Sequence, residues 1–303
     1  MMNRPLVIRI IISGLLILIF GYLLIGLVTG RIKLPTQNVE RETERIEDVI
    51  DPDAAVSDAT LSGQDVTQEE SLINPEGMTI RKRFLCPKGY TRDSHKKQSF
   101  AAFLEAYPLY KDGKAVRLYD GSKKRNQSDH AAVLKMDLVD GDLQQCADSV
   151  LRLYTEYFWK TGQKDKIRFH LADGTMCAYD ASKYSSLDSY MHYLFAYAST
   201  LSMDEESKEI KSEQLQAGDI LIRGGSPGHV VMVLDVCTDD SGRKAFLLGQ
   251  GFMPAQQFHV LKNPNNLQNA DDPWYYTSQL KYPFHTPEYT FEKHSLKRPS
   301  YLQ

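Results

Sequence analysis

The chain has 303 residues, of which 42% are hydrophobic and 25% are charged, and its formal net charge is −3. These values are typical of a globular protein with room for one large domain or two small ones. The chain has no basic stripe with interleaved aromatic residues, so its composition argues against nucleic-acid binding.

The N-terminal 33 residues contain the clearest local signal. Residues 10–29 carry no charge and are almost continuously apolar, and about 20 such residues span a bilayer as a helix. No small-residue cleavage motif follows this long run, so we predict a retained membrane anchor, with a cleaved signal peptide as the alternative. Arg4 and Arg9 precede the run and favour an N-terminus in the cytoplasm. The globular part is therefore expected to be extracytoplasmic or periplasmic.

Residues 34–77 have a different composition. Residues 36–75 hold 11 acidic and two basic residues and show no sustained hydrophobic period. Such a segment buries too little apolar surface to fold alone. We predict a flexible acidic linker over 34–77, followed by one globular α+β domain over 78–303.

Three strand-like runs follow one another in the second half of the chain. They are Asp219–Ile222, His229–Val236 and Lys244–Gln250, joined by the turn sequences GGSPG and TDDSG. The pattern predicts an antiparallel meander. His229 opens the middle strand and Gln250 closes the last one, so the second hairpin should bring the two side chains together.

Helical signals dominate the first half of the globular part. Helices are expected over Ser99–Tyr107 and Leu187–Leu201, and a third is expected after Gly141. In the third helix Asp142 has the position of an N-cap, with Gln145 three residues later. Two strands are expected before this helix, over Ala115–Tyr119 and Ala131–Leu138. The polar loop between them contains a Lys-Lys-Arg run and is expected to be solvated. Helices that precede a meandering sheet predict an α+β fold.

The four cysteines are Cys86, Cys146, Cys177 and Cys237, and their spacing matches no C-x-x-C motif. An even count in an exported protein permits disulfides. The histidines show no paired spacing typical of a metal site. We therefore predict no metal and no cofactor, and the disulfide pattern stays open.

Cys146 lies near the start of the third helix. Unpaired backbone N–H groups and the helix dipole lower the pKa of a thiol at such a position. His229 has the chemistry of a general base and Gln250 that of the group that orients its ring. The Cys146 backbone N–H and the side chain of Gln145, or of its neighbour Gln144, are candidate donors to an oxyanion. The structural alternative is a buried cysteine and a strand-capping histidine.

Seven stretches cover most of residues 80–292: RFLCPKGYTR, SFAAFLEAYPL, DLQQCADSVLRLYTEY, FAYASTLSM, GDILIRGGSPGHVVMVLD, QGFMPAQQFHVLKNP and TPEYTF. Together they resemble an uncharacterised bacterial family, a domain of unknown function. Gly251 and Phe252 stand where that family usually has Ser and Tyr. The family brings no established activity.

The chain order of Cys146, Gly218-Asp219, His229 and Gln250 is also similar to NlpC-type and CHAP-type papain-like hydrolases. This resemblance implies a papain-like α+β core, in which the cysteine-bearing helix packs on an antiparallel sheet. It also implies cleavage of cell-wall peptides or other amides. Two features depart from it: Gln-Cys-Ala-Asp replaces the usual Asp-Cys-Ser-Gly, and the hairpin between the His and Gln positions is longer.

The leading functional hypothesis is a membrane-anchored thiol hydrolase of the cell envelope, of the amidase or peptidase type, acting on peptidoglycan peptides. Its site would consist of Cys146, His229, Gln250 and Gln145. The alternative is a non-catalytic envelope domain that binds cell-wall or carbohydrate ligands, with the aromatic segment Trp274–Tyr276 as its contact surface. A transferase with the same acyl-enzyme chemistry also stays open.

Overall fold

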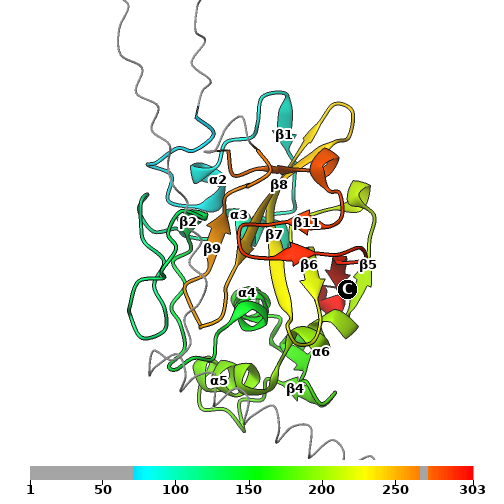
Figure 1. The fold of residues 1–303 in the computed structure, drawn as a ribbon. Helices are drawn as coiled ribbons and strands as arrows, with labels where there is room; N and C mark the ends of the chain where they lie inside the picture. The colour runs from blue at the N-terminus through cyan, green and yellow to red at the C-terminus, as the bar shows by residue number, and fades with distance from the viewer. Residues whose placement is uncertain (1–70, 267–271, 303) are drawn as a thin grey trace, which may run out of the picture. The chain divides into compact units, whose positions relative to one another are not determined.

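The structure is a computed structural model and describes residues 71–266 and 272–302. Its centre is an antiparallel sheet of nine strands, seven of them in the order β2-β9-β8-β7-β6-β13-β5 (Figure 1). β1 pairs with β7, and β10 pairs with β8. The strands of this sheet are β1 (Tyr90–Arg92), β2 (His130–Val133), β5 (Ser207–Glu209), β6 (Ile220–Arg223), β7 (His229–Asp239), β8 (Lys244–Gln250), β9 (His259–Leu261), β10 (Tyr275–Tyr276) and β13 (Leu296–Pro299).

Short elements surround this sheet. Two further two-stranded sheets pair β3 (Arg168–His170) with β4 (Met176–Ala178) and β11 (Phe284–His285) with β12 (Thr290–Phe291). The α-helices are α2 (Ile80–Arg83), α3 (Phe100–Glu105), α4 (Cys146–Lys160), α5 (Leu187–Tyr197) and α6 (Thr200–Glu205). Short 3₁₀ turns lie at Lys164–Lys166, Ser212–Gln214, Thr277–Gln279 and Ser300–Leu302.

The side chains of β7 alternate between two apolar clusters on opposite faces of the sheet. Val230 and Met232 join the larger cluster beneath α3 and α4, whereas Val231 and Val233 join a smaller one. Successive side chains of a strand point to opposite faces, so a strand covered on both sides is apolar at consecutive positions. This explains why His229–Val236 reads as a nearly continuous apolar run.

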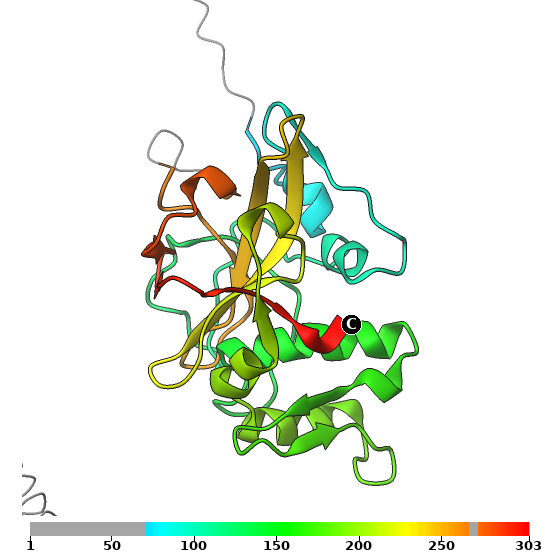
Figure 2. The ribbon, with the colours of Figure 1, turned by 90° about the vertical axis from the view of Figure 1, so that its right-hand side faces the viewer.

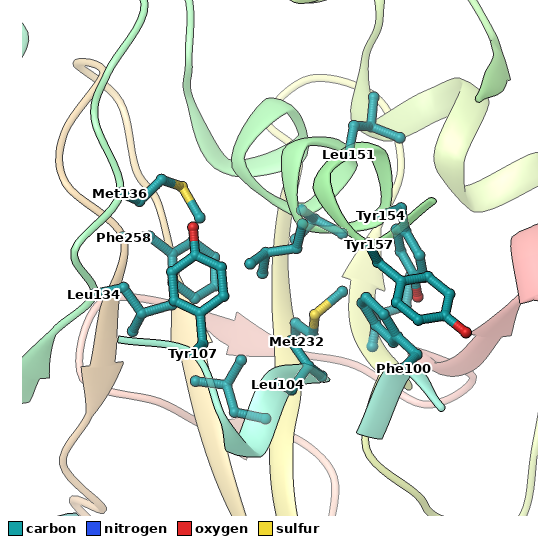
Figure 3. Close-up of a cluster of buried hydrophobic side chains, with 14 of the residues drawn as sticks. Phe100, Leu104, Tyr107, Leu134, Met136, Leu151, Tyr154, Tyr157, Met232 and Phe258 are labelled. Carbon is teal, nitrogen blue, oxygen red and sulfur yellow. The ribbon is translucent and has the colours of Figure 1, made fainter. Parts of the chain in front are cut away.

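Helix α4 packs on the larger cluster. Figure 3 shows Tyr154 and Tyr157 from this helix near Phe100 of α3 and Met232 of β7. The Tyr154 ring stacks on Phe100 with 4.5 Å between the ring centroids. Its buried hydroxyl donates to the carbonyl oxygen of Gly218 at 2.8 Å, so the polar end of the side chain is satisfied.

The C-terminal segment fixes α4 from a second direction. In Figure 2 it crosses the sheet and ends beside this helix. β13 pairs with both β6 and β5, and the ring of Tyr301 lies 5.0 Å from that of Tyr154. Arg298 on β13 forms an ion pair with buried Asp219 at 2.7 Å. The sheet and α4 are thus connected through the end of the chain.

The fold class predicted from sequence is wrong. We expected an α+β papain-like core of the NlpC type, together with an N-terminal transmembrane helix. The described chain is instead rich in sheet, with one large antiparallel sheet and few helices, and no papain-like core is found. The prediction failed because β1, β2 and β13 come from segments distant from the meander, and local sequence patterns do not reveal such pairings.

The expected membrane anchor over 10–29 lies outside the described residues. Within 71–266 and 272–302, no helix has the length and apolar character that crossing a bilayer requires. The boundaries predicted at residues 33 and 77 stay predictions.

The helix expected over Leu187–Leu201 forms two helices, α5 and α6. The break falls at Ala198 and Ser199, where the backbone is extended and the Ser199 hydroxyl accepts a hydrogen bond from the Ser202 N–H. Serine is a preferred N-cap, because its hydroxyl satisfies an otherwise unpaired N–H. The sequence pattern was thus right about the helical content and wrong about its continuity.

A disulfide joins Cys86 to Cys237 on β7 across 151 positions of sequence. Removing it by the double change Cys86→Ala/Cys237→Ala should lower the free energy of unfolding by about 2–4 kcal/mol, since the unfolded chain loses a constraint. Denaturant titration under non-reducing conditions measures this difference. Cys177→Ala is the control because it removes a buried sulfur without opening a cross-link. An equal loss in both variants would contradict a cross-link effect.

Candidate functional site

Cys146 is the first residue of α4. The N-cap is Gln145, whose backbone N–H donates to Oδ2 of Asp148 at 3.0 Å. Asp142, the cap expected from sequence, instead accepts a hydrogen bond from the Ala255 N–H at 2.6 Å. The helix therefore starts later than predicted, and the thiol lies at the helix start itself rather than one turn inside.

The thiol of Cys146 is free and partly buried. Burial and the nearby Asp148 carboxyl raise its pKa to about 11, although the backbone N–H groups of Ala147, Val230 and Cys146 itself act to lower it. The thiol is thus protonated at neutral pH. The expected lowering of the pKa by the helix start is outweighed by desolvation, which disfavours the charged thiolate.

Asp148 is a functional candidate that the sequence reasoning missed. Its Oδ2 accepts the cap hydrogen bond, whereas its buried Oδ1 has no hydrogen-bond partner in the described part of the chain. Burial raises its pKa to about 8, so the carboxyl is largely protonated at pH 7. The available signal was its place three residues after the N-cap, where acidic side chains commonly bond back to the cap.

His229 and Gln250 meet as the sequence predicted. His229 Nε2 lies 2.8 Å from Gln250 Oε1, and both residues are buried. Burial lowers the pKa of His229 to about 4, and the bond to Gln250 only partly offsets this. The rings of Phe252 and Tyr289 lie 4.8 and 4.9 Å from the imidazole. His229 is therefore neutral at pH 7 and largely shielded from water.

A polar network extends from Gln250 to residues that the sequence did not single out as site residues. Gln250 Nε2 donates to Glu288 Oε2 at 2.7 Å, and Lys124 Nζ lies 2.6 Å from the same oxygen. His259 Nε2 lies 3.5 Å from Gln250 Nε2. Lys124 belongs to the Lys-Lys-Arg run expected to be solvated, but it is only 8% exposed. That expectation is wrong for this lysine, because the partly buried Glu288 provides an ion-pair partner.

The start of α4, the start of β7 and the end of β8 converge. The Cys146 thiol lies near the N–H of Val230, the residue that follows His229. A Cβ on Gly251 would approach Ser149 Oγ to 2.4 Å, so the residue after Gln250 lies directly against the first turn of α4. No hydrogen bond joins the thiol to the His229 ring in this structure. The backbone segments that carry the predicted residues therefore meet. The thiol packs with the larger cluster and the imidazole with Tyr289 and Phe291 of the smaller one, so the thiol and the imidazole are not bonded to each other.

The two candidate oxyanion donors differ in their surroundings. Gln144 is buried, with its Oε1 2.8 Å from an Arg152 nitrogen and its Nε2 3.3 Å from Met136 Sδ. Gln145 is partly exposed, and its Nε2 lies 3.2 Å from Asp142 Oδ1. Gln144 is thus held by internal partners, whereas Gln145 lies at the protein surface beside Cys146.

The aromatic segment that supported the binding alternative is mostly buried. Trp274 and Tyr275 are fully buried, and the Trp274 indole N–H donates to the carbonyl oxygen of Leu85 at 2.9 Å. The Tyr276 hydroxyl donates to Asp272 at 2.9 Å. These side chains fill the interior and do not form an exposed ligand platform.

Comparison with known proteins identifies a family but no activity. The family model described as Domain of unknown function (4846) matches residues 80–184 and 178–298. These matches span most of the chain, which therefore belongs to that family, as its resemblance in sequence predicted. No curated protein and no solved structure matches the chain, and the similarity to NlpC-type and CHAP-type hydrolases finds no support in these comparisons.

Replacing Asp148 by Asn should lower the pKa of Cys146 from about 11, because the variant removes a nearby negative charge that disfavours the thiolate. The rate of iodoacetamide alkylation of Cys146 as a function of pH, followed by mass spectrometry, measures this shift. Asp188→Asn is the matched control, since Asp188 lies in the first turn of α5 and is exposed. An unchanged Cys146 titration in Asp148→Asn would refute the interaction.

The same variant should change how stability depends on pH. The Asp148 pKa is raised from 3.8 to about 8 in the folded state. The folded chain therefore binds this proton more tightly than the unfolded chain, and stability falls as pH rises from about 4 through 8. Asp148→Asn lacks this pH-dependent loss. The free energy of unfolding of the variant should therefore rise relative to that of the native chain across that range. Thermal unfolding at a series of pH values tests this, and a constant difference would contradict it.

Proposed function

We propose that this protein is a thiol hydrolase of amide bonds, with Cys146 as nucleophile and His229 as general base. The observation that carries the proposal is the buried hydrogen bond between His229 and Gln250, together with a free thiol at the start of α4 that lies near the N–H of Val230, the residue after His229. A nucleophile, a base and a group that orients the base are the components of such a site. The proposal depends on these local groups and not on a papain-like fold.

The pKa values favour general-base activation over a standing ion pair. The thiol and the imidazole are both neutral at pH 7, so the proton leaves Cys146 as sulfur attacks the substrate carbonyl. His229 accepts that proton and transfers it to the leaving amine as the C–N bond breaks, which leaves a thioester on sulfur. Water then attacks the thioester with His229 as base, releasing a carboxylic acid and restoring the thiol.

The negative oxygen of the tetrahedral intermediates needs hydrogen-bond donors. The backbone N–H of Cys146 at the start of α4 is one candidate, and Nε2 of the adjacent Gln145 is the other. Helix N-termini favour negative charge because their N–H groups have no partner within the helix. Gln145 would have to exchange its bond to Asp142 for one to the substrate.

The disulfide supports an extracytoplasmic location for the domain. Cys86 and Cys237 are bonded, which leaves Cys146 and Cys177 as the free thiols. Structural disulfides persist in oxidising compartments and are rare in the cytosol. Together with the anchor expected over residues 10–29, this favours an enzyme facing the cell envelope, and peptidoglycan peptides are the first substrate class to test.

Cys146→Ala should abolish hydrolysis of a panel of peptidoglycan peptides by the purified full chain. His229→Ala should reduce the rate by about 10²–10⁴-fold, which is the usual contribution of general acid–base catalysis. Release of new amine groups measures the reaction, and Cys177→Ala serves as a control with the other free cysteine removed.

Two results would count against this function. One is hydrolysis that persists in Cys146→Ala. The other is a native protein that cleaves nothing in the panel and whose Cys146 alkylation rate does not respond to His229→Ala. The second result would direct attention to ligand-binding assays and the non-catalytic alternative.

A further inference from the structure

The orientation of the Gln250 amide determines which nitrogen of His229 carries the proton. Gln250 Oε1 faces His229 Nε2 at 2.8 Å. A carbonyl oxygen only accepts hydrogen bonds, so in this orientation Nε2 must be the protonated nitrogen. Nδ1 then keeps a lone pair, and it makes no hydrogen bond to any described residue. With the amide reversed, the preferred tautomer would be the opposite one.

Glu288 fixes this orientation. Its Oε2 lies 2.7 Å from Gln250 Nε2, and an ionised carboxylate can only accept hydrogen bonds. The nitrogen of the Gln250 amide must therefore face Glu288, and the oxygen must face His229. The direction of the amide follows from the chemistry of its neighbour.

His259 is a second acceptor for the same amide. Its Nδ1 lies 3.0 Å from the carbonyl oxygen of Gln257, so Nδ1 carries the proton and Nε2 has a lone pair. Gln250 pairs with His259 across β8 and β9, and the two Nε2 atoms are 3.5 Å apart. Burial lowers the pKa of His259 to about 3, so the ring stays neutral. Both N–H groups of the Gln250 amide therefore face acceptors.

Lys124 provides a second donor to Glu288. Its ammonium lies 2.6 Å from Glu288 Oε2, and the two side chains are 9% and 16% exposed. An ammonium can only donate hydrogen bonds, so Glu288 Oε2 is the acceptor for Lys124 as well as for Gln250. The carboxylate is thereby held in place beside the Gln250 amide.

We propose that Glu288 and Lys124 are positioning residues that hold His229 in the Nε2–H tautomer, through the amide of Gln250. Nδ1 is then the ring nitrogen available to take a proton. The catalytic consequence rests on the proposed function, whereas the tautomer is a property of the folded protein alone. The segments involved are far apart in sequence, because Lys124 lies in the loop before β2 and Glu288 lies between β11 and β12.

Nuclear magnetic resonance of the full chain labelled with ¹⁵N-histidine tests the proposal. The nitrogen shifts and long-range proton correlations distinguish protonated from bare ring nitrogens, and His229→Gln assigns the signal. The native protein should show a protonated Nε2 and a bare Nδ1 at pH 7. A protonated Nδ1 on neutral His229 would overturn the proposal, and this measurement needs no destabilised variant.

The double change Lys124→Met/Glu288→Met tests whether this ion pair determines the tautomer of His229. It removes both charges together, so no buried charge is left without its partner. The Nδ1–H tautomer of His229 should become visible, and peptide hydrolysis should fall by about tenfold or more. Lys297→Met/Asp204→Met is the matched control, because it removes another Lys–Asp/Glu pair at 2.6 Å and should leave the His229 signal unchanged.

The outcomes separate this proposal from the proposed function. A native tautomer that persists in the Lys124→Met/Glu288→Met protein would overturn the positioning role. A tautomer that shifts in that variant, in a protein that hydrolyses no peptide, would support the positioning role and remove the hydrolase function.

Discussion

The antiparallel pairing of β7 with β8 is the constraint on which the rest of the structure depends. Met232 pairs with Gly249, so Gln250 lies beside Val231, two residues along β7 from His229. Diagonal neighbours on one face of a sheet are within reach of long side chains. A slip of one residue would move a whole set of side chains to the opposite face. The strands also form the floor of both apolar clusters, so the register that packs the core also forms the His229–Gln250 pair.

The helix N-terminus and burial act on the pKa of Cys146 in opposite directions. Their relative sizes decide whether the thiol is protonated. A helix N-terminus favours a negative charge by about 0.3–1 kcal/mol at exposed sites. The rise of the Cys146 pKa from 9.0 to about 11 corresponds to roughly 3 kcal/mol in the other direction. Burial and the Asp148 charge together therefore outweigh the effect of the helix start, and the thiol stays protonated at pH 7.

The parts of the site that sequence could predict are those encoded locally. The three strands of the meander begin and end within three residues of their predicted limits, because alternation and turn residues mark them directly. The cap of α4 was misplaced because the carboxylate of Asp142 is used by an N–H 113 residues away. The fold class failed for the same reason, since strands from both ends of the domain extend the meander. Lys124 and Glu288 lie in loops, where no periodicity marks a buried pair.

The polar network around Gln250 carries a large cost in desolvation free energy. Its members His229, Gln250 and His259 are at most 2% exposed, and Lys124 is 8% exposed. Desolvating an ion pair can cost more than its attraction returns, and well-packed apolar residues of similar volume are often equally stable or more so. The smaller cluster on the same face of the sheet is built in that simpler way, from Val231, Phe291 and their neighbours.

A requirement for stability alone would therefore not account for a connected network of a lysine, a carboxylate, an amide and two neutral imidazoles. Each donor in this series faces an acceptor, from the Lys124 ammonium to the His259 lone pair. Satisfied buried networks of this kind specify a single arrangement of side chains. Of the four ring nitrogens of His229 and His259, only Nδ1 of His229 has no hydrogen-bond partner among the described residues. The residue that follows His229, Val230, has its N–H near the Cys146 thiol. The proposed function gives this network a role that packing alone does not.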